Sequence, residues 1–135
     1  LRDQTKCVTI MGDQTPADAV EIKVKDEEII KLDQLEIKAL HTPGHTPGSQ
    51  CFKINDNLIS GDTLFIQGCG RVDLPGSNSD DMYHSLNKLS GLSDETILYP
   101  GHHYSPEEFQ TMGKTKEQNM YLKIPDIESW RQIMG

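Results

Sequence analysis

The chain has 135 residues, of which 35% are hydrophobic, and its 13 basic and 21 acidic side chains give a formal net charge of −8. This length suits a single domain with one modest core. No apolar run approaches the ~20 residues that a membrane-spanning helix needs. The acidic balance, with lysines scattered among acids, argues against a nucleic-acid-binding surface. We therefore expect neither a membrane nor a nucleic acid among the partners.

The cysteines are odd in number and contain no C-x-x-C pair; they are Cys7, Cys51 and Cys69. Free thiols in a reducing compartment are the simplest interpretation of this pattern. The sequence therefore predicts a cytoplasmic protein. Cys69 differs from the other two because it lies between Gly68 and Gly70, in a loop that we expect to be functional.

In the first half of the chain, short apolar runs are separated by turn-forming residues, a pattern that predicts strands. The expected strands are residues 7–11, 19–24, 27–32, 34–40, 50–54 and 57–60. Leu35, Ile37 and Ala39 have period-two spacing and should share one face of their strand. Asn55 and Asp56 separate the last two strands and predict a hairpin turn.

The second half of the chain turns helical. Ser79 is the expected N-cap of a helix that extends to residue 89, because two acids follow it in the first turn, where the helix dipole favours them. Gly91 should end this helix. Its apolar stripe consists of Met82, Leu86 and Leu89.

One strand and one further helix complete the pattern. Residues 96–100 predict a buried strand, and residues 126–135 predict a helix that Asp126 caps. The side chains that this helix should bury are Ile127, Trp130 and Met134. Strands first and helices mixed in later indicate an α/β layered domain.

Three polar residues each follow an apolar strand in a glycine-containing loop. They are His45, Asp62 and His102, after the strands at 34–40, 57–60 and 96–100. Neighbouring strands of one sheet would bring such loops together at one edge. Two imidazoles and a carboxylate are suitable ligands for zinc or non-haem iron. The prolines and glycines of "HTPGHTPGS" exclude a helix and hold His45 in a rigid loop.

The sequence also contains several longer motifs, which are "TPGHTPGS", "SGDTLF", "GCGRVDLPG", "MYHSLNKL", "DETILYPGHHY" and "IESWRQIMG". Together they resemble the second half of a metallo-β-lactamase-fold protein, in particular the glyoxalase II-like hydrolases and the persulfide dioxygenases. They follow in order from about Cys7 to Gly135. The resemblance implies that residues 1–135 form a single partial domain, the second half of an αββα sandwich.

The resemblance also implies roles for individual residues. In the dinuclear hydrolases, the residue matching His45 binds the first metal, the one matching Asp62 bridges both, and the one matching His102 binds the second. The implied cofactor is two zinc ions, and the implied substrate is a thioester or a glutathione conjugate. Arg71 and Tyr104 are the expected substrate-binding residues. An ion pair with Asp73 is the alternative role of Arg71.

Two alternative functions remain open. A persulfide dioxygenase would use one iron, held by residues matching His45 and Asp62 together with a histidine from the family's H-x-H-x-D-H motif.

The second alternative arises because that motif is absent, since the histidines are His41, His45, His84, His102 and His103. The chain would then be an inactive fragment or a module that requires an N-terminal half. We expect that half, or self-association, to complete it.

The remaining histidines are expected to play other roles. His103 stands where relatives usually have Asp, and adjacent side chains in an extended loop diverge, so it should lie beside the metal site or in solvent without binding the ion. His41 and His84 should serve packing or lie exposed.

Overall fold

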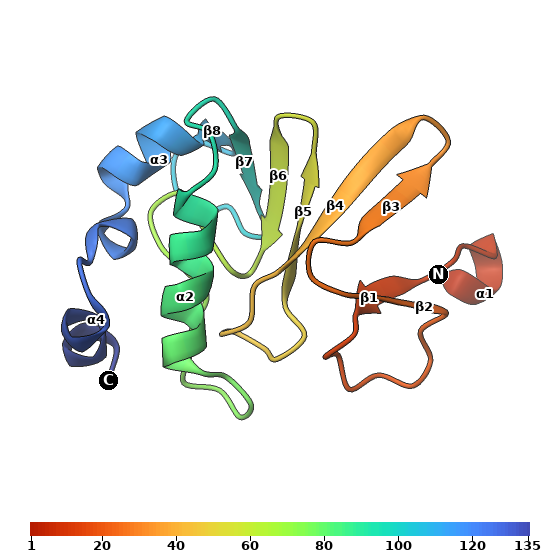
Figure 1. The fold of residues 1–135 in the computed structure, drawn as a ribbon, viewed down its shortest axis with the longest axis horizontal. Coiled ribbons are helices and arrows are strands. Elements are labelled where there is room, and N and C mark those ends of the chain that lie inside the picture. Colours follow the sequence, from red (N-terminus) through yellow and green to blue (C-terminus); the bar gives the residue numbers. More distant parts are fainter.

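The computed structural model describes residues 1–135 and contains two sheets and four α-helices (Figure 1). The strands are β1 (Ile10–Gly12), β2 (Ile22–Val24), β3 (Ile29–Leu32), β4 (Leu35–His41), β5 (Gln50–Ile54), β6 (Asn57–Gly61), β7 (Ile97–Pro100) and β8 (Gln110–Thr111). The helices are α1 (Arg2–Thr5), α2 (Ser79–Ser90), α3 (Met112–Gln118), the 3₁₀ helix η1 (Met120–Lys123) and α4 (Ile127–Met134).

The six-stranded sheet has the order β3-β4-β5-β6-β7-β8. The pairs from β3 to β6 are antiparallel, β6 and β7 are parallel, and β8 pairs antiparallel to β7. β4, β6 and β7 therefore run in the same direction, and their carboxyl ends meet at one edge of the sheet. Asn55, at φ 50, lies in the predicted turn between β5 and β6.

The amino-terminal strands form a separate two-stranded parallel sheet, in which Ile10 pairs with Ile22. We expected longer strands here, at 7–11 and 19–24. The observed strands are shorter because pairing is confined to Ile10–Gly12 with Ile22–Val24. The two termini lie at opposite ends of the molecule in Figure 1.

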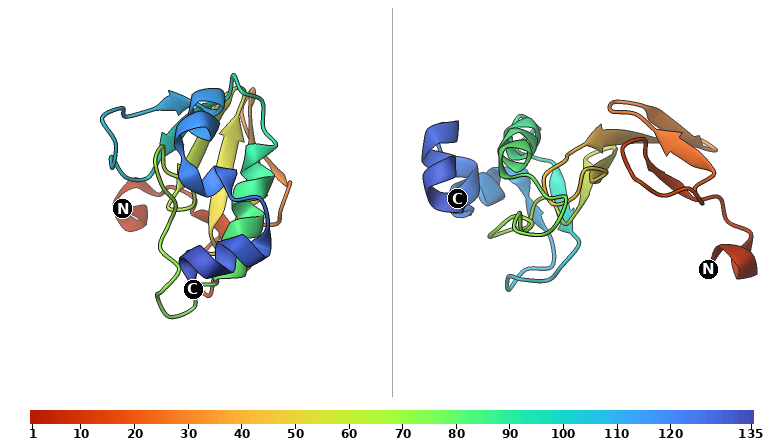
Figure 2. Two further views of the ribbon diagram at one scale, coloured as in Figure 1. Left: turned by 90° about the vertical axis from the view of Figure 1, so that its left-hand side faces the viewer. Right: turned by 90° about the horizontal axis from the view of Figure 1, so that it is seen from below.

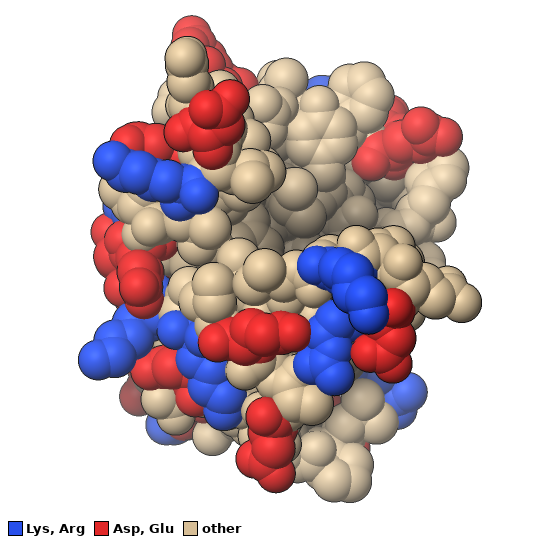
Figure 3. All heavy atoms as spheres, turned by 90° about the vertical axis from the view of Figure 1, so that its right-hand side faces the viewer, with Lys and Arg blue, Asp and Glu red and all other residues tan.

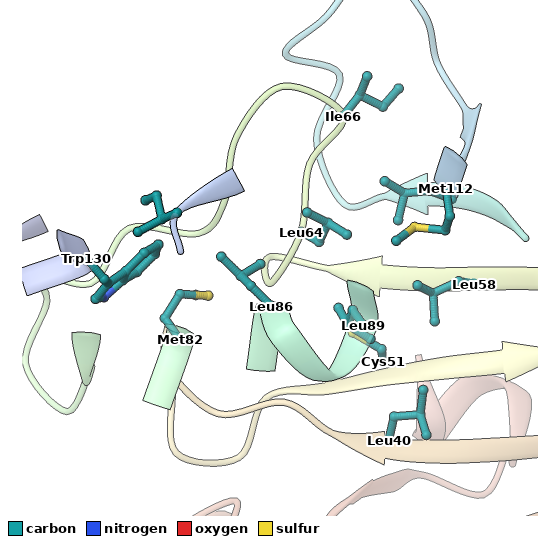
Figure 4. Close-up of a cluster of buried hydrophobic side chains, with 12 residues drawn as sticks. Leu40, Cys51, Leu58, Leu64, Ile66, Met82, Leu86, Leu89, Met112 and Trp130 are labelled. Carbon is teal, nitrogen blue, oxygen red and sulfur yellow. The ribbon is translucent and has the colours of Figure 1, made fainter. Parts of the chain in front are cut away.

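Helix α2 covers one face of the six-stranded sheet. Its buried side chains include Met82, Leu86 and Leu89, as the sequence predicted, and they belong to one buried cluster with Leu40, Cys51 and Leu58 of the sheet (Figure 4). The N-cap is Asn78 and not Ser79, because the Asn78 side chain accepts the Asp81 amide at 3.0 Å.

Ser79 instead connects α2 to the C-terminal helix. Its carbonyl and hydroxyl oxygens each accept a hydrogen bond from Trp130 Nε1 at 2.9 Å. Trp130 is fully buried, and Asp126 caps α4 through the Ser129 amide, as predicted. Figure 2 shows α2, α3 and α4 gathered on the same side of the sheet. Residues 105–125, for which the sequence predicted no element, contain β8, α3 and η1.

The opposite face of the sheet carries apolar side chains without a helical layer. Ile59 and Tyr99 are register partners on this face and are 45% and 37% exposed. Phe109, which is 54% exposed, lies 5.5 Å from the Tyr99 ring centroid. We call Ile59, Tyr99 and Phe109 the open face.

Charged side chains of both signs are interspersed on the molecular face that Figure 3 shows. None of the helices has the length and apolar character required to cross a membrane.

Candidate metal centre

The three loops that follow β4, β6 and β7 bring His45, Asp62 and His102 together. His45 Nε2 lies 3.8 Å from one carboxylate oxygen of Asp62, and His102 Nε2 lies 3.2 Å from the other. All three residues line one pocket of about 300 Å³, together with Arg71 and Tyr104. The direction of the strands explains this convergence, because β4, β6 and β7 end at the same edge.

Two glycines allow these loops to approach so closely. A Cβ atom on Gly101 would lie 2.8 Å from Asp62 Oδ1. One on Gly70 would collide with the carbonyl oxygen of Asp62 and lie 3.1 Å from the Cβ of His45. The backbone before His102 and the backbone after Cys69 therefore both need residues without a side chain.

The environment of His45 determines which of its ring nitrogens is available to bind a metal ion. Its Nδ1 lies 2.9 Å from the carbonyl oxygen of Arg71, which can only accept a hydrogen bond. Nδ1 therefore carries the proton, and in the neutral ring Nε2 presents a lone pair toward the Asp62 carboxylate. Two acceptors face each other across 3.8 Å, an arrangement that a cation between them would stabilise.

The donor set fits zinc or iron. Imidazole nitrogen and carboxylate oxygen are ligands of both metals, and a histidine that donates its other ring N–H to a backbone carbonyl is a usual arrangement at such centres. No group of three or more His, Cys, Asp or Glu side chains in residues 1–135 could hold a metal ion by itself. His45 and Asp62 would contribute to one ion, and Asp62 and His102 to a second.

Aromatic rings pack around His102. Its ring stacks on Tyr104 with a centroid separation of 4.9 Å and an interplanar angle of 6°. Phe65 contacts both rings edge-on, at 5.9 Å from His102 and 5.2 Å from Tyr104. These contacts restrict the rotation of the His102 side chain. Tyr104 therefore both lines the pocket and packs on the imidazole, a second role that sequence reasoning missed.

Arg71 forms the ion pair that was considered as the alternative to substrate binding. Its Nε and a terminal nitrogen donate to the two carboxylate oxygens of Asp73 at 2.7 and 2.8 Å. The hydrogen bond from Arg71 lowers the pKa of Asp73 to about 2. Arg71 also lines the pocket, so its ion pair with Asp73 holds the guanidinium group at the wall of the pocket.

Cys69 lines the same pocket and is partly buried. Burial raises the pKa of its thiol to about 12. The group is therefore a neutral thiol at physiological pH, whereas metal binding and nucleophilic attack both require the thiolate.

The other histidines lie outside this pocket. His103 is exposed, with Nε2 3.4 Å from the carbonyl oxygen of Pro106. His41 lies at the end of β4, and its Nδ1 is buried without a hydrogen-bond partner. His84 is exposed on α2, next to Tyr83.

A buried hydroxyl network lies beneath the loops and was not expected from the sequence. Thr42 Oγ1 lies 3.2 Å from Thr63 Oγ1 and 3.3 Å from Cys51 Sγ. Ser60 Oγ donates to the Leu64 carbonyl at 2.6 Å. The network connects the carboxyl ends of β4 and β6, from which His45 and Asp62 project. Scattered Thr and Ser carry no pattern that would have identified it.

Comparison with known proteins gives a family match. The model described as "Metallo-beta-lactamase superfamily" matches residues 3–102. The probable polyketide biosynthesis zinc-dependent hydrolase BaeB of Bacillus velezensis is 33% identical over 108 residues, which are 79% of this chain and 48% of BaeB. The hydroxyacylglutathione hydrolase of Tolumonas auensis is 33% identical over 113 residues, 81% of this chain and 43% of that protein.

The human mitochondrial persulfide dioxygenase ETHE1 is 30% identical over 132 residues, which are 96% of this chain and 51% of that protein. The crystal structure of ETHE1 from Myxococcus xanthus superposes with a TM-score of 0.91 at 30% identity, over 98% of this chain and 59% of that one. The chain thus spans about half the length of the curated relatives it matches.

Proposed function

Because the chain belongs to the metallo-β-lactamase superfamily, we propose that residues 1–135 form one half of a metal-dependent hydrolase. His45, Asp62 and His102 are its share of the metal ligands. The observation that carries the proposal is the position of Asp62, whose two carboxylate oxygens face one histidine each at 3.8 and 3.2 Å. A carboxylate between two imidazoles is suited to bridge two ions.

Zinc is the proposed metal, with two ions in the complete site. When bound, zinc lowers the pKa of a coordinated water to about 7, so that hydroxide is available at neutral pH. The chain's own residues keep the ligands in place: the Arg71 carbonyl holds the His45 ring through Nδ1, and the Tyr104 and Phe65 rings pack on His102.

The proposed substrate is a thioester, in particular a glutathione conjugate. Arg71 and Tyr104 line the pocket beside the three ligands. The guanidinium group of Arg71 can donate hydrogen bonds to a carboxylate of a glutathione-type substrate, since its pair with Asp73 is exposed and leaves donors free. The identity with a hydroxyacylglutathione hydrolase supports this substrate class.

An iron-dependent persulfide dioxygenase is the second candidate. The persulfide dioxygenase ETHE1 aligns over 96% of the chain, a larger share than either hydrolase reported above covers. In this case His45 and Asp62 would hold a single iron together with one further histidine, a 2-His-1-carboxylate arrangement. His102 would then lie beside the iron site without binding the metal.

We further propose that a second half completes the site. His45 and Asp62 would hold one ion and Asp62 and His102 the other, so each ion would have only two protein ligands from these residues, whereas catalytic zinc ordinarily has about three. The open face supports this proposal, because Ile59 and Tyr99 lie on a sheet surface that a second layer would bury.

Metal analysis of the full-length protein, combined with two assays, tests the proposal. Two zinc ions per chain and chelator-sensitive cleavage of a hydroxyacyl thioester of glutathione would support the hydrolase. One iron per chain and oxygen uptake with glutathione persulfide would support the dioxygenase. Asp62→Ala should remove activity in both assays. If Asp62→Ala kept full metal content and full activity, the metal role of Asp62 would be refuted.

A further inference from the structure

Asn119 connects the C-terminal segment to the loop that follows Asp62. Its side chain is fully buried, and its Nδ2 donates to the carbonyl oxygens of Phe65 and Gly68, each at 2.9 Å. Its Oδ1 accepts the Tyr121 amide at 3.0 Å and caps η1. Both amide protons of Asn119 are therefore used on a loop more than 50 residues away in the sequence.

The two carbonyls that Asn119 binds lie in a tight turn of that loop. The turn is closed by the Phe65 amide bound to the Gly68 carbonyl at 3.0 Å and by the Gly70 amide bound to the Thr63 carbonyl at 3.1 Å. The Gly68 carbonyl thus accepts from both Phe65 and Asn119. Ile66 in the same turn is buried in the core, and the Asn119 amide adds two hydrogen bonds that attach the turn to the C-terminal segment.

The same turn contacts one histidine of the candidate metal centre and leads into the residue that holds the other. Phe65 packs edge-on against His102. At the other end of the turn, Gly70 leads into Arg71, whose carbonyl oxygen holds Nδ1 of His45. A shift of the turn would therefore change the packing of one imidazole and the hydrogen bond of the other.

We propose that Asn119 is a positioning residue for the metal site, acting through the Phe65–Gly68 turn. The effect on the turn itself follows from the contacts alone, whereas the effect on metal affinity rests on the function proposed above. The competing explanation is that Asn119 serves only as the cap of η1.

Asn119→Asp separates these two explanations. Aspartate has nearly the same volume, keeps the oxygen that caps η1 and is itself a favourable N-cap. It lacks both N–H donors and places an oxygen against the Phe65 and Gly68 carbonyls. A capping role would survive this substitution, whereas the attachment of the turn would be lost.

Gln110→Glu is a matched control in the same segment. Gln110 is buried, and its Nε2 donates to Thr115 Oγ1 at 3.3 Å and to Gln118 Oε1 at 3.2 Å. Both of its partners belong to α3. The control thus removes two buried amide donors near Asn119 without touching the loop.

The cysteines provide the readout. Cys69 follows the turn directly and is partly buried, Cys51 is buried in the core, and Cys7 is exposed. In the metal-stripped full-length protein, we would measure iodoacetamide modification of each cysteine by peptide mass spectrometry. Cys7 monitors the reagent, Cys51 monitors global unfolding, and Cys69 monitors opening of the turn.

We expect Asn119→Asp to raise the Cys69 rate at least about tenfold over the Gln110→Glu control, a factor that corresponds to about 1.4 kcal/mol, with the Cys51 rate unchanged. Zinc affinity should fall about 10- to 100-fold, as for other groups that orient metal ligands. Equal Cys69 rates in the two variants would overturn the proposal. An opened turn with unchanged zinc affinity would overturn its metal part.

Two further outcomes keep the test decisive. If Asn119→Asp does not fold, Asn119→Ser replaces it, because serine also caps helices and its hydroxyl is too short to reach the turn. If the wild-type protein binds no zinc, the zinc hydrolase proposed above fails, while the Cys69 rates still decide whether Asn119 holds the turn.

Discussion

The Nδ1 atom of His45 lies 2.9 Å from the backbone carbonyl oxygen of Arg71, so the loop after β4 is held by the loop after β6. This contact orients the imidazole without involving the Arg71 side chain. The guanidinium group instead pairs with Asp73. The backbone and the side chain of Arg71 therefore have separable functions.

Arg71→Ala should separate them in an assay. We expect metal content to stay at the wild-type level, because the carbonyl that holds His45 is retained. The KM for a glutathione thioester should rise about tenfold or more, since a charge-assisted hydrogen bond contributes about 1.5–3 kcal/mol. Asp73→Ala is the control that frees the guanidinium group. Loss of metal in Arg71→Ala would contradict this division of roles.

Asp62 and His103 should differ sharply in their effect on metal binding. Asp62→Ala removes the carboxylate that faces both histidines and should abolish stoichiometric metal. His103 points to the Pro106 carbonyl, so His103→Asp should keep metal affinity within the ~10–100-fold range of residues near a site. Complete loss of metal in His103→Asp, measured by elemental analysis, would show that the wrong histidine was assigned.

Gly101→Ala tests the close approach of the loops. The added Cβ would lie 2.8 Å from Asp62 Oδ1, so either Asp62 or His102 must move, and we expect zinc affinity to fall about 10- to 100-fold. Gly68→Ala is the control, because its Cβ would meet nothing nearer than a Phe65 ring carbon at 3.8 Å. Titration of both variants with zinc against a chelating dye would compare them directly. Similar affinities would refute the steric argument.

The pair of Arg71 and Asp73 should be visible in an acid titration. The hydrogen bond from Arg71 lowers the pKa of Asp73 from 3.8 to about 2. A lowered pKa in the folded state stabilises the fold at pH values above 3.8, and this contribution is lost as the pH falls toward about 2. NMR titration of the Asp73 carboxyl should show the low pKa, and Arg71→Ala should return it toward its ordinary value.

Elements with a strong apolar period were predictable from the sequence. β4, α2 and α4 lie within about one residue of their predicted bounds, because a buried stripe leaves a repeating pattern. Helix α3 was missed because among its seven residues only Met112 and Thr115 are buried, too few to define a stripe. The N-cap of α2 is Asn78, whereas the sequence predicted the next residue, Ser79. The two could not be told apart because Asn and Ser are both good N-caps.

The candidate site was predictable only in part, for a physical reason. His45, Asp62 and His102 could be grouped because each follows a strand, and the order of strands places their loops at one edge. Asn119 had no such signal. It is a single polar residue between α3 and η1, and its importance arises from a contact with Phe65, 54 residues away. Long-range pairs of this kind leave no local pattern.

The last prediction concerns residues 1–135 expressed alone. Ile59, Tyr99 and Phe109 are exposed on the open face, and a contiguous apolar surface promotes association. Each proposed metal position also has two protein ligands instead of about three. We therefore expect this segment to bind zinc weakly, to cleave no thioester and to form oligomers at micromolar concentration in analytical ultracentrifugation.

Ile59→Lys should reduce this association, because it places a charge on the open face, beside Tyr99. Ile133→Lys is the control, since Ile133 is 52% exposed on α4, on the helical side of the sheet. Equal association of the two variants would show that another surface is responsible. Chelator-sensitive thioester cleavage by monomeric residues 1–135 would overturn the larger idea, because a complete site would then exist without a second half.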